Sequence, residues 1–447
     1  MELKQLTQYI IKKALKEGAD QVDVVAVKST TNEVDIRLGE IEKLGSASPK
    51  GLGIRVFKNQ KKAITSTSDF RQKSIDDLVT RTVEMAKVTS QDEYSGLPEK
   101  DMQGMAEADL GLFDEKIQTI PTEKKIELAK KMEKIGMDYD KRITNSDGSS
   151  WSDSVSTFVL ANSNGFYGEQ KTSRCNLSLS LLAEEHGVKQ TDYWYTGKRF
   201  FNQLENIEEV AETAAKRTLR KLGSIKPETQ SVPVVFDPQV GSDFLNIIAS
   251  VILGSAIYRN QSFLLDMLND KVAVDEFTVV DDGLMKSGLG SRLFDDEGLP
   301  SRKNVVIKNG ILKTWLTDTY TGRKLDMKST GNASRGLGSN PSPAVSNFYM
   351  EKGKYSPAEI IKSVKNGLYL TSVHWTGINY ITGDYSRGAE GVWIKDGKLD
   401  QPVQEFTVAS NMKDMMKNIE MIGNDLKFRG SVNAPTFKIT EMTISGK

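Results

Sequence analysis

The chain has 447 residues, which is too long for one ordinary hydrophobic core and favours two domains. Lys and Arg together number 60, and so do Asp and Glu, so a net charge of zero gives no electrostatic reason to expect a nucleic-acid partner. Hydrophobic residues make up 38% and charged residues 27%, which is typical of a globular protein in water.

The polar, amphipathic N-terminus predicts no signal peptide. The most apolar stretch, residues 244–257, is too short to cross a bilayer and predicts a buried helix, so no membrane partner is expected. A single cysteine, Cys175, excludes an intramolecular disulfide framework, and a reducing cytoplasm is the simplest expected location.

The first half of the chain alternates helices with groups of strands. Apolar residues at helical spacing predict helices from Leu3, from Ser74 as N-cap, from Pro121, and from Asn206 as N-cap. Period-2 patterns predict strands at 22–26, 34–38, 51–57, 63–67, 155–161, 177–181 and 192–196. Because the order helix, strands, helix occurs twice, this half is either a duplicated unit or one α+β domain. Residues 92–120 have little periodicity and predict a long connection.

The second half is mostly β. A strand at 232–236 and an apolar helix at 242–257 are followed by two hairpins with type I′ turns, at Asn309-Gly310 and Asp396-Gly397. Capped helices are expected at 356–367 and 411–423, and a final strand at 436–444. The sequence thus predicts an α+β protein. Its N-terminal domain, 1–228, consists of helices packed on an antiparallel sheet, and its C-terminal domain, 229–447, is β-rich with few helices.

Catalytic motifs are largely missing. The two histidines, His186 and His374, fall in different predicted domains, so no H-E-x-x-H zinc helix is possible. The sequence has no C-x-x-C pair, phosphate-binding loop or G-x-S-x-G elbow. We interpret His186 as part of a solvated turn, His374 as a structural side chain with a functional alternative, and Cys175 as an unreactive buried thiol.

Two glycine-rich loops combine arginine with acids. One contains Arg292, Asp295, Asp296 and Glu297, and the other contains Asp384, Tyr385 and Arg387. Adjacent acids can bind Mg²⁺ or Ca²⁺. Spacing alone favours loops organised by Arg–carboxylate pairs and glycine turns, so no metal site is predicted.

The same loops carry a resemblance. The segments 258–266, 288–300, 319–333, 381–389 and 422–426, together with 51–57 near the start, resemble the PmbA (also called TldE) branch of the TldD/PmbA family. Members of this family are metalloprotease-associated proteins that have also been called modulators of DNA gyrase. The resemblance covers nearly the whole chain.

This resemblance implies a two-domain protein that pairs into a dimer around a cavity. A TldD-type subunit carries H-E-x-x-x-H on the first C-terminal helix and a cysteine near the end as zinc ligands, and it is a peptidase for small or unfolded polypeptides. Here the corresponding helix, 244–253, has no His or Glu, and the closing segment, 426–434, has no Cys. The resemblance therefore implies no catalytic residue and no cofactor in this chain, with zinc expected only in a TldD-like partner.

Three hypotheses follow. In the first, the chain is a pseudo-enzyme that completes the cavity of a TldD-like subunit and helps to hold an extended peptide, for example by strand addition at a C-terminal sheet edge. In the second, it is a non-proteolytic peptide-binding homodimer or regulator. In the third, it is a hydrolase that uses His374 with Asp384 or with the acids at 295–297. The candidate cavity or peptide-binding residues are Arg292, Asp295, Asp296, Glu297, His374, Asp384, Tyr385 and Arg387.

Overall fold

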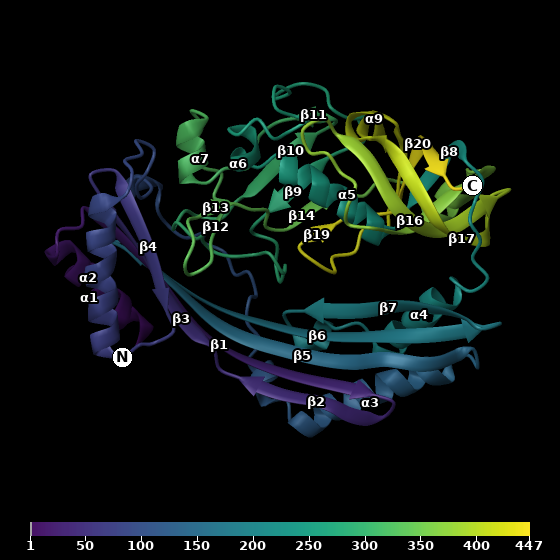
Figure 1. Ribbon diagram of the computed structural model, residues 1–447, viewed down its shortest axis with the longest axis horizontal. Coiled ribbons are helices and arrows are strands. Elements are labelled where there is room, and N and C mark those ends of the chain that lie inside the picture. The colour runs from purple at the N-terminus through teal and green to yellow at the C-terminus, as the bar shows by residue number, and fades with distance from the viewer. Residues whose placement is uncertain (1) are drawn as a thin grey trace.

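The computed structural model describes residues 2–447 and shows an α+β protein, as predicted (Figure 1). The N-terminal half consists of one antiparallel sheet and four helices. Its elements are α1 (Leu3–Lys16), β1 (Gln21–Arg37), β2 (Glu40–Ala47), β3 (Lys50–Lys58), β4 (Lys61–Thr67), α2 (Gln72–Val88), α3 (Thr122–Asp138), β5 (Ile143–Asn162), β6 (Tyr167–Glu185), β7 (Val188–Lys198) and α4 (Ile207–Leu219), with 3-10 turns at Lys100–Met102, Glu115–Thr119 and Phe201–Gln203.

The N-terminal sheet has the strand order β4-β3-β1-β5-β6-β7, with β2 paired to the far part of β1. The two runs of helix, strands, helix therefore meet at the β1–β5 ladder, which runs from Asp23↔Asn162 to Ile36↔Ser149. Even-numbered residues of β1 pack with α1 and α2 at one end and with α3 and α4 at the other. The repeated order thus builds one continuous sheet with all four helices on the same face.

The C-terminal half is β-rich. Its elements are β8 (Gln230–Phe236), α5 (Pro238–Val251), α6 (Gly254–Ile257), β9 (Val279–Asp282), β10 (Lys303–Lys308), β11 (Ile311–Leu312), α7 (Thr319–Lys324), β12 (Ala333–Ser334), β13 (Ser342–Pro343), β14 (Phe348–Met350), α8 (Pro357–Lys362), β15 (Asn366–Val373), β16 (Asp384–Lys395), β17 (Lys398–Asn411), α9 (Met412–Lys417), β18 (Ile419–Ile422), β19 (Val432–Asn433) and β20 (Phe437–Ser445).

A closed barrel organises this half. The strands run β17-β16-β15-β8-β20, and β20 pairs again with β17, so the sheet closes on itself. A second sheet, β11-β10-β9-β14-β19, lies beside it, and α5 contacts strands of both. Phe236 of the barrel stacks on Phe437 with ring centroids 4.6 Å apart, and Phe244 of α5 packs on the same pair. One apolar core therefore joins the barrel, the helix and the second sheet.

Both predicted type I′ hairpins are confirmed. Asn309 and Gly310 have φ values of 49° and 73°, and Asp396 and Gly397 have 48° and 75°. The strands pair directly on either side of each turn, Lys308 with Ile311 and Lys395 with Lys398. Positive φ at both central residues is what a type I′ turn requires, and Asn-Gly and Asp-Gly meet that requirement at low cost.

Several predicted boundaries are wrong. Ser74 lies inside α2, which begins after Arg71, and its hydroxyl donates to Asp69. The runs at 22–26 and 34–38 are one strand, β1. The predicted helix 242–257 breaks where Leu253 becomes extended and pairs with Leu316. The helices expected at 356–367 and 411–423 end at Lys362 and Lys417, because strands β15 and β18 follow at once.

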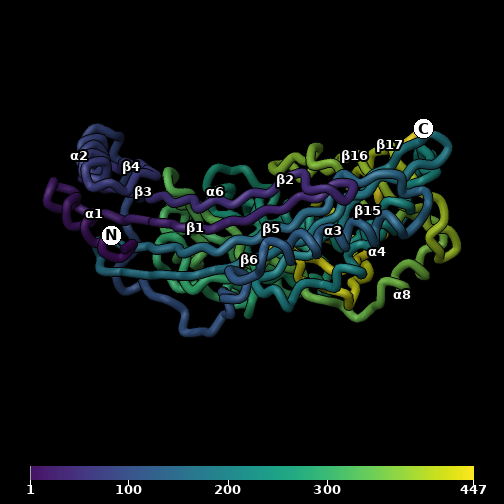
Figure 2. Tube along the Cα trace, turned by 90° about the horizontal axis from the view of Figure 1, so that it is seen from below, coloured from purple at the N-terminus to yellow at the C-terminus, as the bar shows by residue number. Residues whose placement is uncertain are grey.

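The C-terminal half lies over the sheet face opposite the helices, along the long axis that β1, β5 and β6 follow (Figure 2). Val25 and Leu160 of the sheet pack against Phe294 of the C-terminal half. The connection at 92–120 also runs along that half, where Ala106 N donates to Leu293 O at 2.8 Å. Within residues 2–447 no helix has the length and apolarity needed to span a membrane.

Candidate functional site

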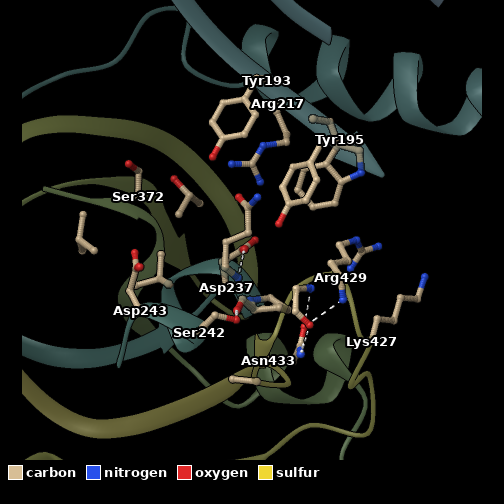
Figure 3. Close-up of a pocket in the computed structure, with 18 of the residues that line it drawn as sticks. Tyr193, Tyr195, Arg217, Asp237, Ser242, Asp243, Ser372, Lys427, Arg429 and Asn433 are labelled. Carbon is tan, nitrogen blue, oxygen red and sulfur yellow. Dashed lines mark hydrogen bonds between the residues drawn. The ribbon is translucent and has the colours of Figure 1, made fainter. Parts of the chain in front are cut away.

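A cleft of about 880 Å³ separates the edge strand β7 from the C-terminal half (Figure 3). Its N-terminal wall comes from β7 and α4, and its C-terminal wall comes from α5, β15 and the segment before β20. The residues that face one another across it include Asp192, Tyr193, Trp194, Tyr195, Arg217 and Lys221 on one side and Asp237, Ser242, Asp243, Asn246, Tyr369, Ser372, Lys427, Arg429 and Asn433 on the other.

Aromatic side chains dominate the β7 wall. Tyr193 and Tyr195 lie on the same face of the strand and stack with ring centroids 6.3 Å apart. The Trp194 ring contacts two guanidinium groups, those of Arg217 and Arg429, each 4.9 Å from the ring centroid. Such contacts hold charged side chains against an aromatic face. Since Arg429 belongs to the C-terminal half, this stack also joins the two walls.

The α5 wall presents carboxylates. Asp237 caps the helix by accepting from Gln239 N at 3.0 Å, and the Tyr369 hydroxyl donates to its other oxygen at 2.8 Å. Asp243 lies further along the same helix. Burial raises the pKa of Asp243, and the charge of Arg387 acts in the opposite direction. Asp243 is thus a partly buried carboxyl group that faces the open cleft.

Polar contacts between the two halves flank the cleft. Arg429 pairs with Glu205 at 3.0 Å, and Lys221 pairs with Glu390 at 2.9 Å. Lys198 Nζ donates to Phe428 O at 2.7 Å. All three contacts are partly exposed, so each adds little to stability, and all three join the N-terminal half to the C-terminal half beside the cleft.

The donors in this cleft do not fit a catalytic zinc, which needs three protein ligands and an open position. The polar side chains that α5 presents to the cleft are Gln239, Ser242, Asp243 and Asn246. The segment before β20, on the same wall, presents Asp425, Lys427 and Arg429 among others, so this wall has neither imidazole nor thiolate. Across residues 2–447 no group of three His, Cys, Asp or Glu side chains is placed to hold a metal ion.

The histidines lie outside the cleft. His186 and Gly187 form the tight turn between β6 and β7, with φ values of 51° and 80°, which confirms the solvated turn. His374 is exposed and packs on Gly388, where an added Cβ would lie 2.7 Å from its Nδ1. In residues 2–447 no hydrogen bond joins His374 to Asp384, whose carboxylate binds Thr382 and Asn411.

The loop predicted for Asp384, Tyr385 and Arg387 is wrong, because these residues pair with β17 and form the start of strand β16. Tyr385 and Arg387 are buried there. Tyr385 is 2% exposed in the barrel core, and the Arg387 guanidinium lies 5.9 Å from its ring. Arg387 Nε also donates to the carbonyl oxygen of His374. Through its effect on Asp243, Arg387 is the one predicted residue with an electrostatic link to the cleft. Cys175 is buried, and burial raises the pKa of its thiol to about 12, which confirms an unreactive side chain.

The acidic loop forms part of a buried contact between the two halves. Arg55 of β3 donates to Asp23 at 2.6 Å and lies 3.6 Å from Glu297. Arg335 reaches Asp23 from the C-terminal side at 2.8 Å. Each side chain in this network is 5% exposed or less, so water cannot solvate the charges. Each charge is instead compensated by an opposite charge, in part from the other side of the domain boundary.

The other acids of this loop, Asp295 and Asp296, accept hydrogen bonds from backbone amides. Asp295 accepts from the amides of Glu297, Leu299 and Ala333. Burial and the neighbouring Glu297 raise the pKa of Asp295 to about 7. Asp296 accepts from Arg335 N and lies 3.6 Å from Arg292. These contacts agree with the prediction from residue spacing that arginine–carboxylate pairs organise this loop.

Asp318 of the same network predicts a pH effect. Burial and Glu297 raise its pKa to about 6, so between pH 4 and 6 the folded protein retains a proton that the unfolded chain releases. Because the folded state binds more protons than the unfolded state in that window, the free energy of unfolding falls as the pH rises through it. Asp318→Asn removes this titrating group. Between pH 4 and 6.5 we expect the free energy of unfolding, measured with urea, to fall in the wild type by on the order of 2 kcal/mol more than in the variant. Parallel pH profiles would contradict this assignment.

Sequence patterns missed most of the cleft. Tyr193, Trp194 and Tyr195 were assigned only to a strand, although three consecutive aromatic residues on an edge strand are a recognisable signal for a contact surface. Asp243 and Asn246 were polar exceptions in an apolar helix. Whether they line a binding cleft depends on which face of the helix is exposed to that cleft, and periodicity alone does not identify this face.

Three family models match the chain: PmbA/TldA metallopeptidase domain 1 over residues 22–86, the central domain over 115–222, and the C-terminal domain over 229–446. Metalloprotease PmbA of Escherichia coli O157:H7 is 34% identical over 429 residues, covering 96% of this chain and 93% of that protein. The metalloprotease PmbA homolog of Haemophilus influenzae is 33% identical over 446 residues, covering 100% and 96%.

Solved structures agree over the full length. A Bacteroides thetaiotaomicron protein, named as a candidate modulator of DNA gyrase, superposes with a TM-score of 0.92 at 29% identity and covers 99% of each chain. TldE from Thermococcus kodakarensis has a TM-score of 0.90 at 21% identity, covers 99% of this chain and 100% of its own, and shows the same fold.

Proposed function

Because the chain belongs to the PmbA/TldD metallopeptidase family, we propose that it is the PmbA/TldE-type subunit of a TldD-like zinc metalloprotease complex that acts on small or unfolded peptides. In this proposal the chain has no zinc site and is inactive alone. A TldD-like partner supplies the metal, and this chain contributes a wall that binds peptide. The single buried cysteine fits a complex of the reducing cytoplasm.

The observation that carries the proposal is the chemistry of the cleft. Its volume of about 880 Å³ is within the range of binding clefts, and its α5 wall has carboxylate and amide groups where a catalytic zinc would need imidazole or thiolate. A cleft that is open but lacks the imidazole and thiolate ligands of a catalytic zinc supports peptide binding without metal-dependent hydrolysis.

Peptide binding is supported by the β7 wall. β7 is the last strand of its sheet and pairs only with β6 among residues 2–447. Edge strands accept extended peptides through main-chain hydrogen bonds, and neighbouring aromatic rings provide contacts that depend little on sequence. Tyr193 is half exposed, Tyr195 is partly buried beside it, and both rings line the cleft, where a peptide that lies along β7 would meet them.

The test is reconstitution with a subunit that carries H-E-x-x-x-H. We expect the purified chain to contain no stoichiometric zinc and to leave an unfolded peptide intact, while the co-expressed pair contains one zinc per pair and cleaves it. Metal analysis and chromatography of the digest give both readouts. Tight zinc binding by this chain alone would overturn the proposal, and so would full activity of the zinc subunit by itself.

A paired substitution tests the cleft. Tyr193→Ala with Tyr195→Ala should weaken peptide binding at least tenfold, because two aromatic rings that line the cleft are lost. Tyr139→Ala, a half-exposed tyrosine at the end of α3, is the matched control and should change nothing. If this chain binds peptide with no partner and the pair never cleaves, the alternative of a non-proteolytic homodimer or regulator is the correct one.

A further inference from the structure

A second pocket lies at the opposite end of the domain boundary from the cleft. Its volume is about 220 Å³, below the usual range for drug-sized ligands, so it suits a ligand the size of one or two amino acids. It is lined by Arg55, Phe57, Lys62, Tyr94, Ser95, Gly96, Ser255, Tyr258, Arg259, Glu297, Asp318, Tyr320, Thr321, Asn340, Pro341, Ser342 and Pro343.

The floor of this pocket carries an excess negative charge. The buried network there holds three carboxylates, Asp23, Glu297 and Asp318, against two guanidinium groups, Arg55 and Arg335, which leaves one negative charge. Both side-chain hydrogen bonds to Asp318 in residues 2–447 end on Oδ1, from the amide and hydroxyl of Thr321. Its second oxygen is left for a donor inside the pocket.

The mouth of the pocket carries an excess of positive charge. Lys62 and Arg259 provide two positive charges, and Asp92 offsets one of them. Lys62 Nζ is 3.9 Å from Asp92, which is too far for a hydrogen bond, and lies 4.8 Å over the Tyr320 ring. Arg259 Nε donates to the Tyr258 hydroxyl at 2.8 Å, and the residue as a whole is exposed. The mouth therefore has donors available for an anion.

The wall between floor and mouth is aromatic. Tyr320 packs edge to face against Tyr94 and Tyr258, with ring centroids 6.4 and 6.2 Å away. Ser95 of the same wall has a buried hydroxyl oxygen with no hydrogen-bond partner in residues 2–447. Arg323 fixes this wall by donating to the carbonyl oxygens of Tyr94 and Leu97 at 3.1 and 2.8 Å. The pocket thus has a negative floor, a positive mouth, a stacking surface and an unused polar group.

We propose that this pocket binds a small zwitterion, a free amino acid or dipeptide, with its α-ammonium group at Asp318 and its α-carboxylate at Lys62 and Arg259. The negative floor of the pocket complements the α-ammonium group, and the positive mouth complements the α-carboxylate group. The tyrosine rings between them can contact the side chain of the ligand. The site is separate from the interdomain cleft, so it stands whether or not the chain acts in a peptidase complex.

The probes are L-phenylalanine and L-alanyl-L-phenylalanine, titrated calorimetrically into the purified full-length chain. We expect at least one of them to bind. N-acetylation, which removes the ammonium group, and amidation, which removes the carboxylate, should each raise Kd at least tenfold. If neither probe binds, or if the blocked analogues bind equally well, the proposal is wrong.

Two substitutions locate the binding. Asp318→Asn keeps the helix cap through its remaining oxygen and should raise Kd at least tenfold while the thermal unfolding curve shows an intact fold. Lys62→Met should weaken binding of the free acid but not of the amide. Asp243→Asn in the interdomain cleft is the matched control and should leave Kd unchanged. Loss of binding in Asp243→Asn with none in Asp318→Asn would place the ligand in the cleft and overturn the assignment.

Discussion

Replacing Arg55 with methionine is expected to lower the free energy of unfolding by about 3–5 kcal/mol. The Arg55 side chain is 5% exposed and is shared between Asp23 and Glu297, which lie on opposite sides of the domain boundary. Without it, three buried carboxylates share the single guanidinium group of Arg335. Methionine fills much of the same volume, so the loss reports the uncompensated charge rather than a cavity.

Denaturant unfolding at two pH values tests this result. The loss should be greater at pH 8 than at pH 5, because the pKa of a buried carboxylate rises once its cation is removed and protonation then relieves the repulsion. Arg71→Met is the matched control. Arg71 is also bonded to an aspartate, Asp69 at 2.6 Å, but its side chain is 84% exposed, so the stability should barely change. Equal losses in the two variants would contradict a buried network.

Gly53→Ala is expected to cost about 3 kcal/mol, at the upper end of the range for overpacked cores. Gly53 lies on β3, and a Cβ there would be 1.8 Å from the carbonyl oxygen of Leu337 and 2.7 Å from its carbon. These are backbone atoms of the C-terminal half, so no rotamer change relieves the clash. The two halves must separate locally, which also strains Arg55 and Arg335, each two residues from the point of contact.

Thermal unfolding and limited proteolysis measure the effect. Gly53→Ala should lower Tm by several degrees and expose the segments that pack across the boundary. Gly45→Ala on β2 is the control, since a Cβ there meets no atom within 4 Å. A stable, protease-resistant Gly53→Ala protein would show that the halves are not in such close contact.

Local chemistry decided which elements could be predicted from sequence. Asn309-Gly310 and Asp396-Gly397 specify turns through backbone conformation alone, so they were located to the residue. β2 was missed because nearly all of it is exposed, which leaves no alternation between buried and exposed residues to detect. Ser74 was misassigned as a cap because a cap depends on where the helix begins, and Arg71 occupies that position instead.

The candidate site was harder to predict because its parts are distant in sequence. Glu297 was proposed together with its acidic neighbours Asp295 and Asp296, but its partner Arg55 lies more than 200 residues earlier in the chain, and so does Asp23, with which Arg55 also pairs. The cleft joins Tyr193 to Asp243 only through the packing of two halves. No local pattern encodes that packing. The eight residues proposed from sequence lie in the loop at 292–297 and in the β15–β16 hairpin, and none of them lines the cleft.

The 14-residue ladder between β1 and β5 has a consequence for the continuity of the chain. Residues 2–91 are held to the rest of the protein by that ladder, by the apolar contact around Val25 and by the Arg55 network. Residues 92–120 are held separately, by buried side chains such as Leu97 and Ile117 and by backbone hydrogen bonds such as Ala106 N to Leu293 O. A single break in this connection would therefore leave a nicked but assembled molecule, and the protein is a natural candidate for two-piece complementation with the cut placed between Glu99 and Asp109.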